Sequence, residues 1–425
     1  MRVLAATAAA LILGGWAIVS ADGRGSSDHF FKGEGHWLRH SLKSMRGGHK
    51  RGNSGPIDTL ATWSSSFSAT GVDATGAPKS IWPFTMVGQS PIRQRDDRHG
   101  DGDDRGGRTT WIPAPIVPIN LELHEPDGSV LLVDANPVVG DVLKSPVFSP
   151  TQFSSSRRPT QYADAIQRAQ FFSVADDDWH TMLLPRVMRA RTIVLTQSAD
   201  PSAPTYIAQP NDDGSCCLAV QVDKDAFLNA LVPQTPTDTS TVMGALENAG
   251  RITTRDLSIF VLNNVFFISN SDPSFFGTGF HNYDSEPGSA ANGWRERRYV
   301  MAVSSWITGG VLGTEEFADI SALSHEIVEA IGDPFVTNET PWWLSPANFA
   351  CGNLLEGADV IETAAVGETF PMPMPNGRTY HPVNVALLPW FAGMSPSPAI
   401  DNAYSYPNIG VLTSPNISQT PQCGF

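Results

Sequence analysis

The sequence predicts one α+β domain over residues 110–425. Three patterns support this prediction: a helical periodicity, a β-hairpin and a long apolar run, at residues 320–331, 119–133 and 257–269. In the first, apolar side chains recur every three or four residues, as on one face of a helix. The second holds two alternating runs around a Pro-Asp-Gly turn. The third is almost continuously apolar, which is typical of a strand buried on both faces.

Further elements follow from the same patterns. Residues 161–172 place Tyr162, Ile166 and Ala169 at helical intervals and predict an amphipathic helix. The remaining expected elements are strands at 192–196, 205–209, 217–222 and 299–307, and a helix at 225–231. An apolar strand ahead of the 320–331 helix is therefore expected in the core.

The 320–331 helix has recognisable boundaries. Asp319 precedes the apolar stripe and is the expected N-cap, because its carboxylate can accept a backbone N–H of the first turn. Gly332 followed by Asp333-Pro334 is a stop signal, since the residue before a proline disfavours helical geometry. The chain must turn just after this helix.

This helix carries the segment His325-Glu326-Ile327-Val328-Glu329. Residues four apart share one helical face, so His325 and Glu329 can contact one ion while Glu326 lies beside them. An imidazole and a carboxylate suit zinc, and the extra negative charge makes manganese or calcium alternatives. The other interpretation is an ordinary surface helix with three polar residues.

The segment resembles the His-Glu-x-x-His motif of zinc proteases, with Glu329 at the place of the second histidine. Glutamate-type zinc proteases take a third ligand from a later Glu with an acidic neighbour, and Glu356 with Asp359 resembles that pair. His381 is the reserve third ligand. The same stretch is similar to plant exordium-like secreted proteins, which share a His-Glu-x-x-Glu helix, an Asp-Pro stop and a later Glu-x-x-Asp.

The first resemblance implies a zincin-like mixed sheet with an active-site-type helix behind a flexible leader. It also implies a metal bound by His325, Glu329, Glu356 and Asp359, with Asp359 orienting the other ligands and Glu326 as the general base of a hydrolase acting on peptides or proteins. The second resemblance implies a non-catalytic secreted protein whose acidic cluster is structural or holds a structural metal. Zinc is the expected ion, with manganese or calcium as alternatives.

The N-terminal part predicts export. Residues 1–21 combine a basic start, an apolar stretch and small residues at a cleavage site, as in a signal peptide. Residues 22–109 are rich in Gly, Ser, Asp and Arg and predict a low-complexity or propeptide-like leader. Within the leader, residues 59–87 are more apolar and are expected to add a strand or strap to the body, or to act as a propeptide.

Composition restricts the partners. The net charge of −15, from 28 basic and 43 acidic side chains, argues against nucleic-acid binding, which depends on neutralising phosphates. No stretch after the signal is long and apolar enough to predict a membrane span. Four cysteines in an exported chain predict disulfides, with three pairings open for Cys216, Cys217, Cys351 and Cys423. The mature protein is expected outside the cytoplasm.

Overall fold

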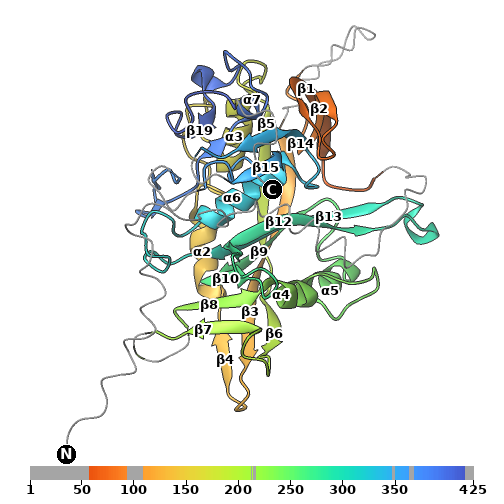
Figure 1. Ribbon diagram of the computed structural model, residues 1–425, viewed down its shortest axis with the longest axis vertical. Coiled ribbons are helices and arrows are strands. Elements are labelled where there is room, and N and C mark those ends of the chain that lie inside the picture. Colours follow the sequence, from red (N-terminus) through yellow and green to blue (C-terminus); the bar gives the residue numbers. More distant parts are fainter. Residues whose placement is uncertain are drawn as a thin grey trace, which may run out of the picture.

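The computed structural model describes residues 57–92, 109–211, 213, 217–346, 350–362 and 368–416. The expected signal peptide at 1–21 and most of the expected leader lie outside these residues. Among the described residues, no helix is both long and apolar enough to cross a membrane. The described body is a mixed α/β structure in which strands predominate (Figure 1).

The main sheet has the strand order β12, β13, β9, β3, β4, and β5 and β6 also pair with β3 (Figure 1). Its strands are β3 (Thr109–His124), β4 (Val130–Val133), β5 (His180–Val187), β6 (Arg191–Thr196), β9 (Leu257–Asn263), β12 (Gly279–Glu286) and β13 (Arg297–Trp306). Strands β5, β6, β9 and β13 run parallel to β3 or to one another, whereas β12 and β4 are antiparallel at the two ends. The sheet is therefore mixed, as the sequence predicts.

Helices cover both faces of this sheet. The helices are α2 (Asn136–Lys144), α3 (Tyr162–Gln170), α4 (Lys224–Leu231), α5 (Val242–Asn248), α6 (Ser321–Gly332) and α7 (Leu388–Phe391), with 3-10 turns at Ala290–Asn292 and Ile400–Asn402. In β9, Ile259 packs with the core on the α6 side, while the next residue, Phe260, packs with the core beside α4 and α5. This alternation follows from the period of two along a strand, and it explains why β9 is apolar throughout.

The 257–269 run is not one strand, contrary to the prediction. It is split at Asn264, which has a φ of 51°. The part before Asn264 is β9 in the main sheet, and the part after it, β10 (Val265–Ile268), enters a second sheet. Asparagine tolerates the left-handed region better than the β-branched residues around it, so the chain bends there. An apolar run by itself does not show such a change of sheet.

The second sheet and the small ribbons complete the body. The four-stranded sheet has the order β11, β10, β8, β7. Its remaining strands are β7 (Tyr206–Gln209), β8 (Ala219–Asp223) and β11 (Phe276–Gly277). The two-stranded pairs are β1 (Thr62–Val72) with β2 (Pro78–Val87), β14 (Glu339–Leu344) with β15 (Cys351–Leu354), β16 (Met372–Pro373) with β17 (Thr379–Tyr380), and β18 (Val385–Ala386) with β19 (Ser405–Tyr406).

Several predicted elements are confirmed. The 119–133 hairpin is β3 with β4, in a register running from Leu121 opposite Val133 to His124 opposite Val130. The 161–172 helix is α3, the 225–231 helix is α4 and the 299–307 strand is β13. The short strands predicted at 192–196, 205–209 and 217–222 correspond to β6, β7 and β8.

Helix α6 begins later than predicted. It starts at Ser321, and Asp319 is not its N-cap. Asp319 has a φ of 47°, and its Oδ1 accepts the N–H groups of Ile320 and His381 at 2.5 and 2.9 Å. The C-terminal stop is confirmed, because the helix ends at Gly332. Asp333 then accepts the N–H groups of Thr337 and Asn338, which turns the chain away from the helix axis.

The β1–β2 hairpin is a strap on the body, one of the forms expected for residues 59–87. Its side chains Trp63, Phe67, Trp82 and Phe84 are buried in a cluster that also contains Trp343 and Phe391. Trp82 has no exposed surface, and its Nε1 donates to the carbonyl of Ala69. Lys79 forms an ion pair with Glu339 of β14 at 2.8 Å. Burial of several aromatic side chains makes this hairpin part of the folded body.

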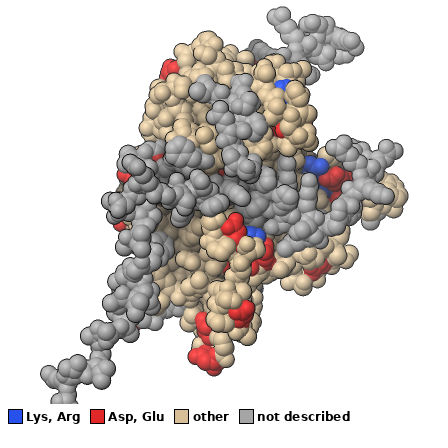
Figure 2. All heavy atoms as spheres, in the orientation of Figure 1, with Lys and Arg blue, Asp and Glu red and all other residues tan. Residues whose placement is uncertain are grey.

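The surface and the cysteines agree with the composition. Figure 2 shows acidic side chains scattered over the described part of one face, with few basic ones among them. Cys217 and Cys351 are the cysteines among the described residues, and both are disulfide-bonded. Cys216 and Cys423 lie outside the described residues, so the connectivity stays a prediction.

Asn338→Ala should lower the free energy of unfolding by about 1–3 kcal/mol, because buried partners lose their hydrogen bonds. The Asn338 amide joins three segments: Oδ1 accepts from Thr85 N–H, and Nδ2 donates to the carbonyls of Thr85 and Gly332, all at 2.8 Å. Urea denaturation measures the loss. Asn248→Ala is the control, because its amide bonds only to its own helix and the preceding loop, at Gly244 and Pro236. Equal small losses in both variants would contradict the bridging role.

Candidate metal centre

Three elements bring the candidate residues together. Helix α6 supplies His325, Glu326 and Glu329. The loop after β15 supplies Glu356 and Asp359, and edge strand β12 supplies His281. In β12, Phe280 packs on the α4 and α5 side, so the alternation of the strand turns its neighbour His281 toward α6.

One group of side chains meets at Nε2 of His325. This nitrogen lies 3.1 Å from Oε2 of Glu329 and 3.1 Å from Oδ1 of Asp359. The first contact is the i,i+4 pair that the helical spacing predicts. The ligand atoms of His325, Glu329 and Asp359 lie within 4.8 Å of one another. These three residues form the first triad.

A second group forms around His281. Its Nδ1 lies 3.6 Å from Oε2 of Glu326 and 3.7 Å from Oε2 of Glu329, and its Nε2 lies 3.8 Å from Oε2 of Glu356. The ligand atoms of His281, Glu329 and Glu356 also lie within 4.8 Å of one another. These residues form the second triad, which shares Glu329 with the first.

Glu329 is held in place by the loop that supplies the other carboxylates. Its Oε1 accepts the backbone N–H groups of Ala358 and Asp359 at 3.0 and 3.3 Å. Its Oε2 is the oxygen that faces both histidines. The two oxygens thus have separate tasks: one anchors the loop to α6, and the other points into the cluster.

Glycine permits the close approach of this loop. A Cβ on Gly357 would meet Cγ1 of Val385 at 2.7 Å and the carbonyl oxygen of Ala386 at 2.9 Å. The loop is also tied to the strap and the helix end, because Leu355 N–H donates to the carbonyl of Asn338 at 2.9 Å. A larger residue at 357 would move Glu356 and Asp359 together.

All members of the two triads are buried, with no more than 3% of each residue exposed. Nε2 of His325, Nε2 of His281 and both carboxylate oxygens of Glu356 and Asp359 have no hydrogen-bond partner within the part of the chain that the structure describes. An unpaired buried charge costs several kcal/mol, so such groups are normally paired or bind a metal. These orphaned atoms point toward one another, which is the arrangement a metal ion requires.

The distances also fit a metal. Ligand atoms around a tetrahedral zinc ion lie about 3.3 Å apart, because each bond is about 2.0 Å long. The two contacts of His325 Nε2, to Glu329 and Asp359, are both 3.1 Å long, which is close to this spacing. Imidazole and carboxylate are ligands that zinc and manganese accept. The residues present therefore fit a divalent cation.

Burial and neighbouring charges shift the pKa values of three residues in this cluster. Burial raises the pKa of Glu356 well above its usual range, and the neighbouring carboxylates of Glu329, Asp333 and Asp359 raise it further. Burial by itself would lower the pKa of His325, but the carboxylates of Glu329 and Glu326 outweigh it, so this pKa rises well above its usual value. Burial and the neighbouring His325 lower the pKa of His281 to about 3.

Glu326 packs against the edge strand. A Cβ on Gly279 of β12 would meet Cγ of Glu326 at 2.8 Å and Oε1 at 2.9 Å, so only glycine leaves room for this carboxylate. Glu326 is 1% exposed, and its Oε2 is directed at His281. The intervening glutamate of the motif therefore lies between helix and strand, next to the second triad.

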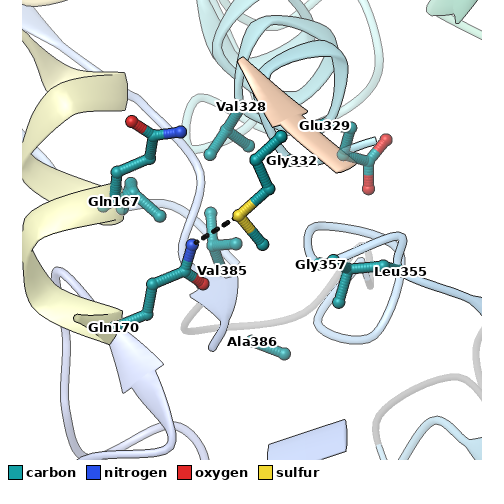
Figure 3. A pocket seen from close by; sticks show the side chains of 11 residues that line it. Gln167, Gln170, Val328, Glu329, Gly332, Leu355, Gly357, Val385 and Ala386 are labelled. Carbon is teal, nitrogen blue, oxygen red and sulfur yellow. Dashed lines mark hydrogen bonds between the residues drawn. The ribbon is translucent and has the colours of Figure 1, made fainter. Parts of the chain in front are cut away.

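A small cavity adjoins the centre. It measures about 30 Å³ and lies between α3, α6, the strap residue Met86 and the loop at Leu355 and Gly357 (Figure 3). Glu329 lines one edge, and Gln167 and Gln170 line the opposite wall on α3. A cavity of this size holds one or two water molecules.

The structure brings together the sequence-predicted residues His325, Glu326, Glu329, Glu356 and Asp359. Asp359 faces the same nitrogen of His325 as Glu329 does, so it is placed as a ligand and not as a residue that orients the other ring nitrogen. The reserve ligand His381 lies elsewhere, with Nδ1 2.7 Å from Oδ2 of Asp319. Since Glu356 is buried, the condition for preferring His381 does not arise.

His281 is a candidate ligand that the His-Glu motif does not reveal. It belongs to no motif, and its approach to α6 depends on the pairing of β12 with β13. The one local signal is its alternation with Phe280, which becomes informative only once the strand and its sheet are known. A histidine on an edge strand ahead of a His-Glu helix is therefore worth testing as a ligand.

The metal-free protein should lose stability as the pH rises above about 6.5. The pKa values of Glu356 and His325 lie above their unfolded values, so their stabilisation is complete below the unfolded pKa and is lost as the pH rises through the folded one. The lowered pKa of His281 makes stability increase with pH, but only at pH values below about 6.5. Urea unfolding in a chelator at several pH values measures this slope.

Glu356→Gln is the control for this pH dependence, because it removes one titrating group and keeps the size of the side chain. The variant should show a shallower slope than the wild type. A divalent ion should restore stability most at the higher pH, since protons compete with metals for these ligands. Identical slopes in the two proteins would show that Glu356 does not titrate as described.

Comparison with protein-family models, curated proteins and solved structures finds no match for this chain.

Proposed function

We propose that this chain is a metal-dependent hydrolase whose first triad holds a divalent ion, zinc being the expected one. The observation that supports this most is the convergence of Glu329 and Asp359 on Nε2 of His325, all buried and at 3.1 Å. Glu326 is adjacent on the same helix. This arrangement is similar to the one expected of a zincin-like site with a carboxylate in place of one histidine, except that Asp359 takes the place expected for Glu356.

The number of ligands favours catalysis. Structural zinc sites are closed by four protein ligands, whereas catalytic sites use three and leave one position open. The first triad offers three ligand atoms within 4.8 Å of one another. Three ligands would leave one coordination position of a tetrahedral ion open, and the adjoining cavity is large enough for water.

Each residue then has a task. His325, Glu329 and Asp359 would hold the ion, and the amides of Ala358 and Asp359 keep Glu329 in place. When bound, a divalent ion polarises a carbonyl oxygen and makes water more acidic. Glu326 would accept the proton released from water, and its burial beside Gly279 would strengthen that role by excluding solvent.

We also propose that the protein is exported and acts on peptides or proteins. The signal-like residues 1–21 support export, and the resemblance to zinc proteases supports the substrate class. The acidic net charge of −15 argues against nucleic acid as a partner.

A non-catalytic protein of the exordium-like kind is the second candidate, and burial favours it. Glu326 is 1% exposed and the adjoining cavity of about 30 Å³ admits water but not a peptide. If this non-catalytic protein holds a structural ion, the ion would join α6, β12 and the loop after β15 and would stabilise the folded state. A purely structural acidic cluster would bind no ion, so metal binding separates that form from the first candidate. Activity separates the metal-bound form.

His325→Ala should abolish stoichiometric metal binding, whereas Glu326→Gln should retain the metal. Elemental analysis of the purified mature protein after equilibration with zinc, manganese or calcium measures both. His381→Ala is the matched control, since this histidine is paired with Asp319 and not with the triad. A wild-type protein that binds none of the three ions would overturn the proposed function.

Glu326→Gln should lower the hydrolysis rate by about 10²–10⁴-fold at unchanged metal content, the usual contribution of a general base. A screen of unfolded protein and peptide substrates with metal-loaded wild type and variant measures this. Metal-dependent stability without any Glu326-dependent hydrolysis would favour the non-catalytic candidate.

A further inference from the structure

We propose that the centre binds two divalent ions bridged by Glu329, with His281 and Glu356 as the remaining protein ligands of the second ion. This inference rests on the proposed metal site at His325, Glu329 and Asp359 and extends it. The sequence motif accounts for one ion only, so the second site is carried by the tertiary structure.

The ligand atoms divide into two sets. Among the described residues, the groups with ligand atoms within 4.8 Å of one another are His281 with Glu329 and Glu356, and His325 with Glu329 and Asp359. No larger group of described residues unites them. A single ion with metal–ligand bonds of ordinary length therefore binds one set or the other. When that ion is bound by His325, Glu329 and Asp359, a second ion is needed to pair His281 and Glu356.

The second set has the unpaired atoms of a ligand site. Nε2 of His281 and both carboxylate oxygens of Glu356 are buried without a hydrogen-bond partner among the described residues, and the two residues are 2% and 3% exposed. Nε2 of His281 lies 3.8 Å from Oε2 of Glu356, beyond hydrogen-bond length. A cation between them would pair both groups, and buried polar groups are normally paired in this way or by hydrogen bonds.

Glu329 is positioned to bridge. Its Oε1 is occupied by the N–H groups of Ala358 and Asp359, while its Oε2 lies 3.1 Å from His325 Nε2 and 3.7 Å from His281 Nδ1. Glu329 thus belongs to both ligand sets, and because the ring of His281 also bonds to the backbone of Asp333, its Nε2 is the nitrogen left for an ion. Paired metal ions in hydrolases lie about 3.5–4 Å apart, a separation that one shared carboxylate oxygen can span.

The charge also balances with two ions. Glu326, Glu329, Glu356 and Asp359 are all buried and carry four negative charges in their ionised form, while the fifth buried carboxylate nearby, Asp333, accepts the N–H groups of Thr337 and Asn338. Two divalent cations neutralise four carboxylates, whereas one leaves an excess in a low-dielectric interior, where it is costly. The ligand set of imidazole and carboxylate in each half suits zinc or manganese.

The test is metal stoichiometry, with zinc alone and then manganese alone as the probe. Wild-type protein should hold two ions per chain, and His281→Ala and Glu356→Gln should each hold one. These two residues come from different elements, so agreement between the variants cannot result from one misfolded segment. His381→Ala should still hold two.

Manganese-loaded protein supplies a second readout, because two bridged ions couple magnetically. The wild type should give a coupled electron paramagnetic resonance spectrum, and His281→Ala should give that of an isolated ion. One ion in the wild type, unchanged in His281→Ala, would overturn the second site and leave the proposed function standing. No ion in the wild type would overturn both.

Discussion

The contact between Glu329 and the backbone of the loop after β15 is the constraint on which the centre depends. Two N–H groups, from Ala358 and Asp359, meet one carboxylate oxygen and fix the loop against α6. Without this contact, Glu356 and Asp359 would have no defined position relative to His325. The loop carries two further carboxylates into a buried site, an arrangement that like charges oppose unless a cation is present.

The surrounding fold makes this burial possible. The main sheet is covered by α6 on one face and by α4 and α5 on the other, so β9 and β13 can be apolar on both sides. The edge strand β12 lies over α6, and glycine at 279 lets Glu326 lie against it. The centre is therefore enclosed by helix, strand and loop, which lowers the local dielectric and strengthens every charge interaction within it.

The β1–β2 strap has a role in the same enclosure. Met86 lines the cavity beside Glu329, and Thr85 is joined through Asn338 to the end of α6. The strap thus packs its aromatic side chains on the body and also closes one approach to the centre. Because the division into leader and body at residue 110 is drawn from composition, it stays a prediction, but residues 57–92 are packed with the described body.

Features that depend on local spacing can be predicted from the sequence. The helical period places His325 and Glu329 on one face, Gly332 and Pro334 end the helix, and the Pro-Asp-Gly turn sets the β3–β4 hairpin. The carboxylates at 356 and 359 were predicted only through a resemblance to a known motif. Tertiary structure decided the rest: the bend at Asn264, the use of Asp319 to bind His381, and the arrival of His281 from an edge strand. These features depend on which strands pair and which faces pack, and contacts between residues distant in the chain leave no periodic signal in the sequence.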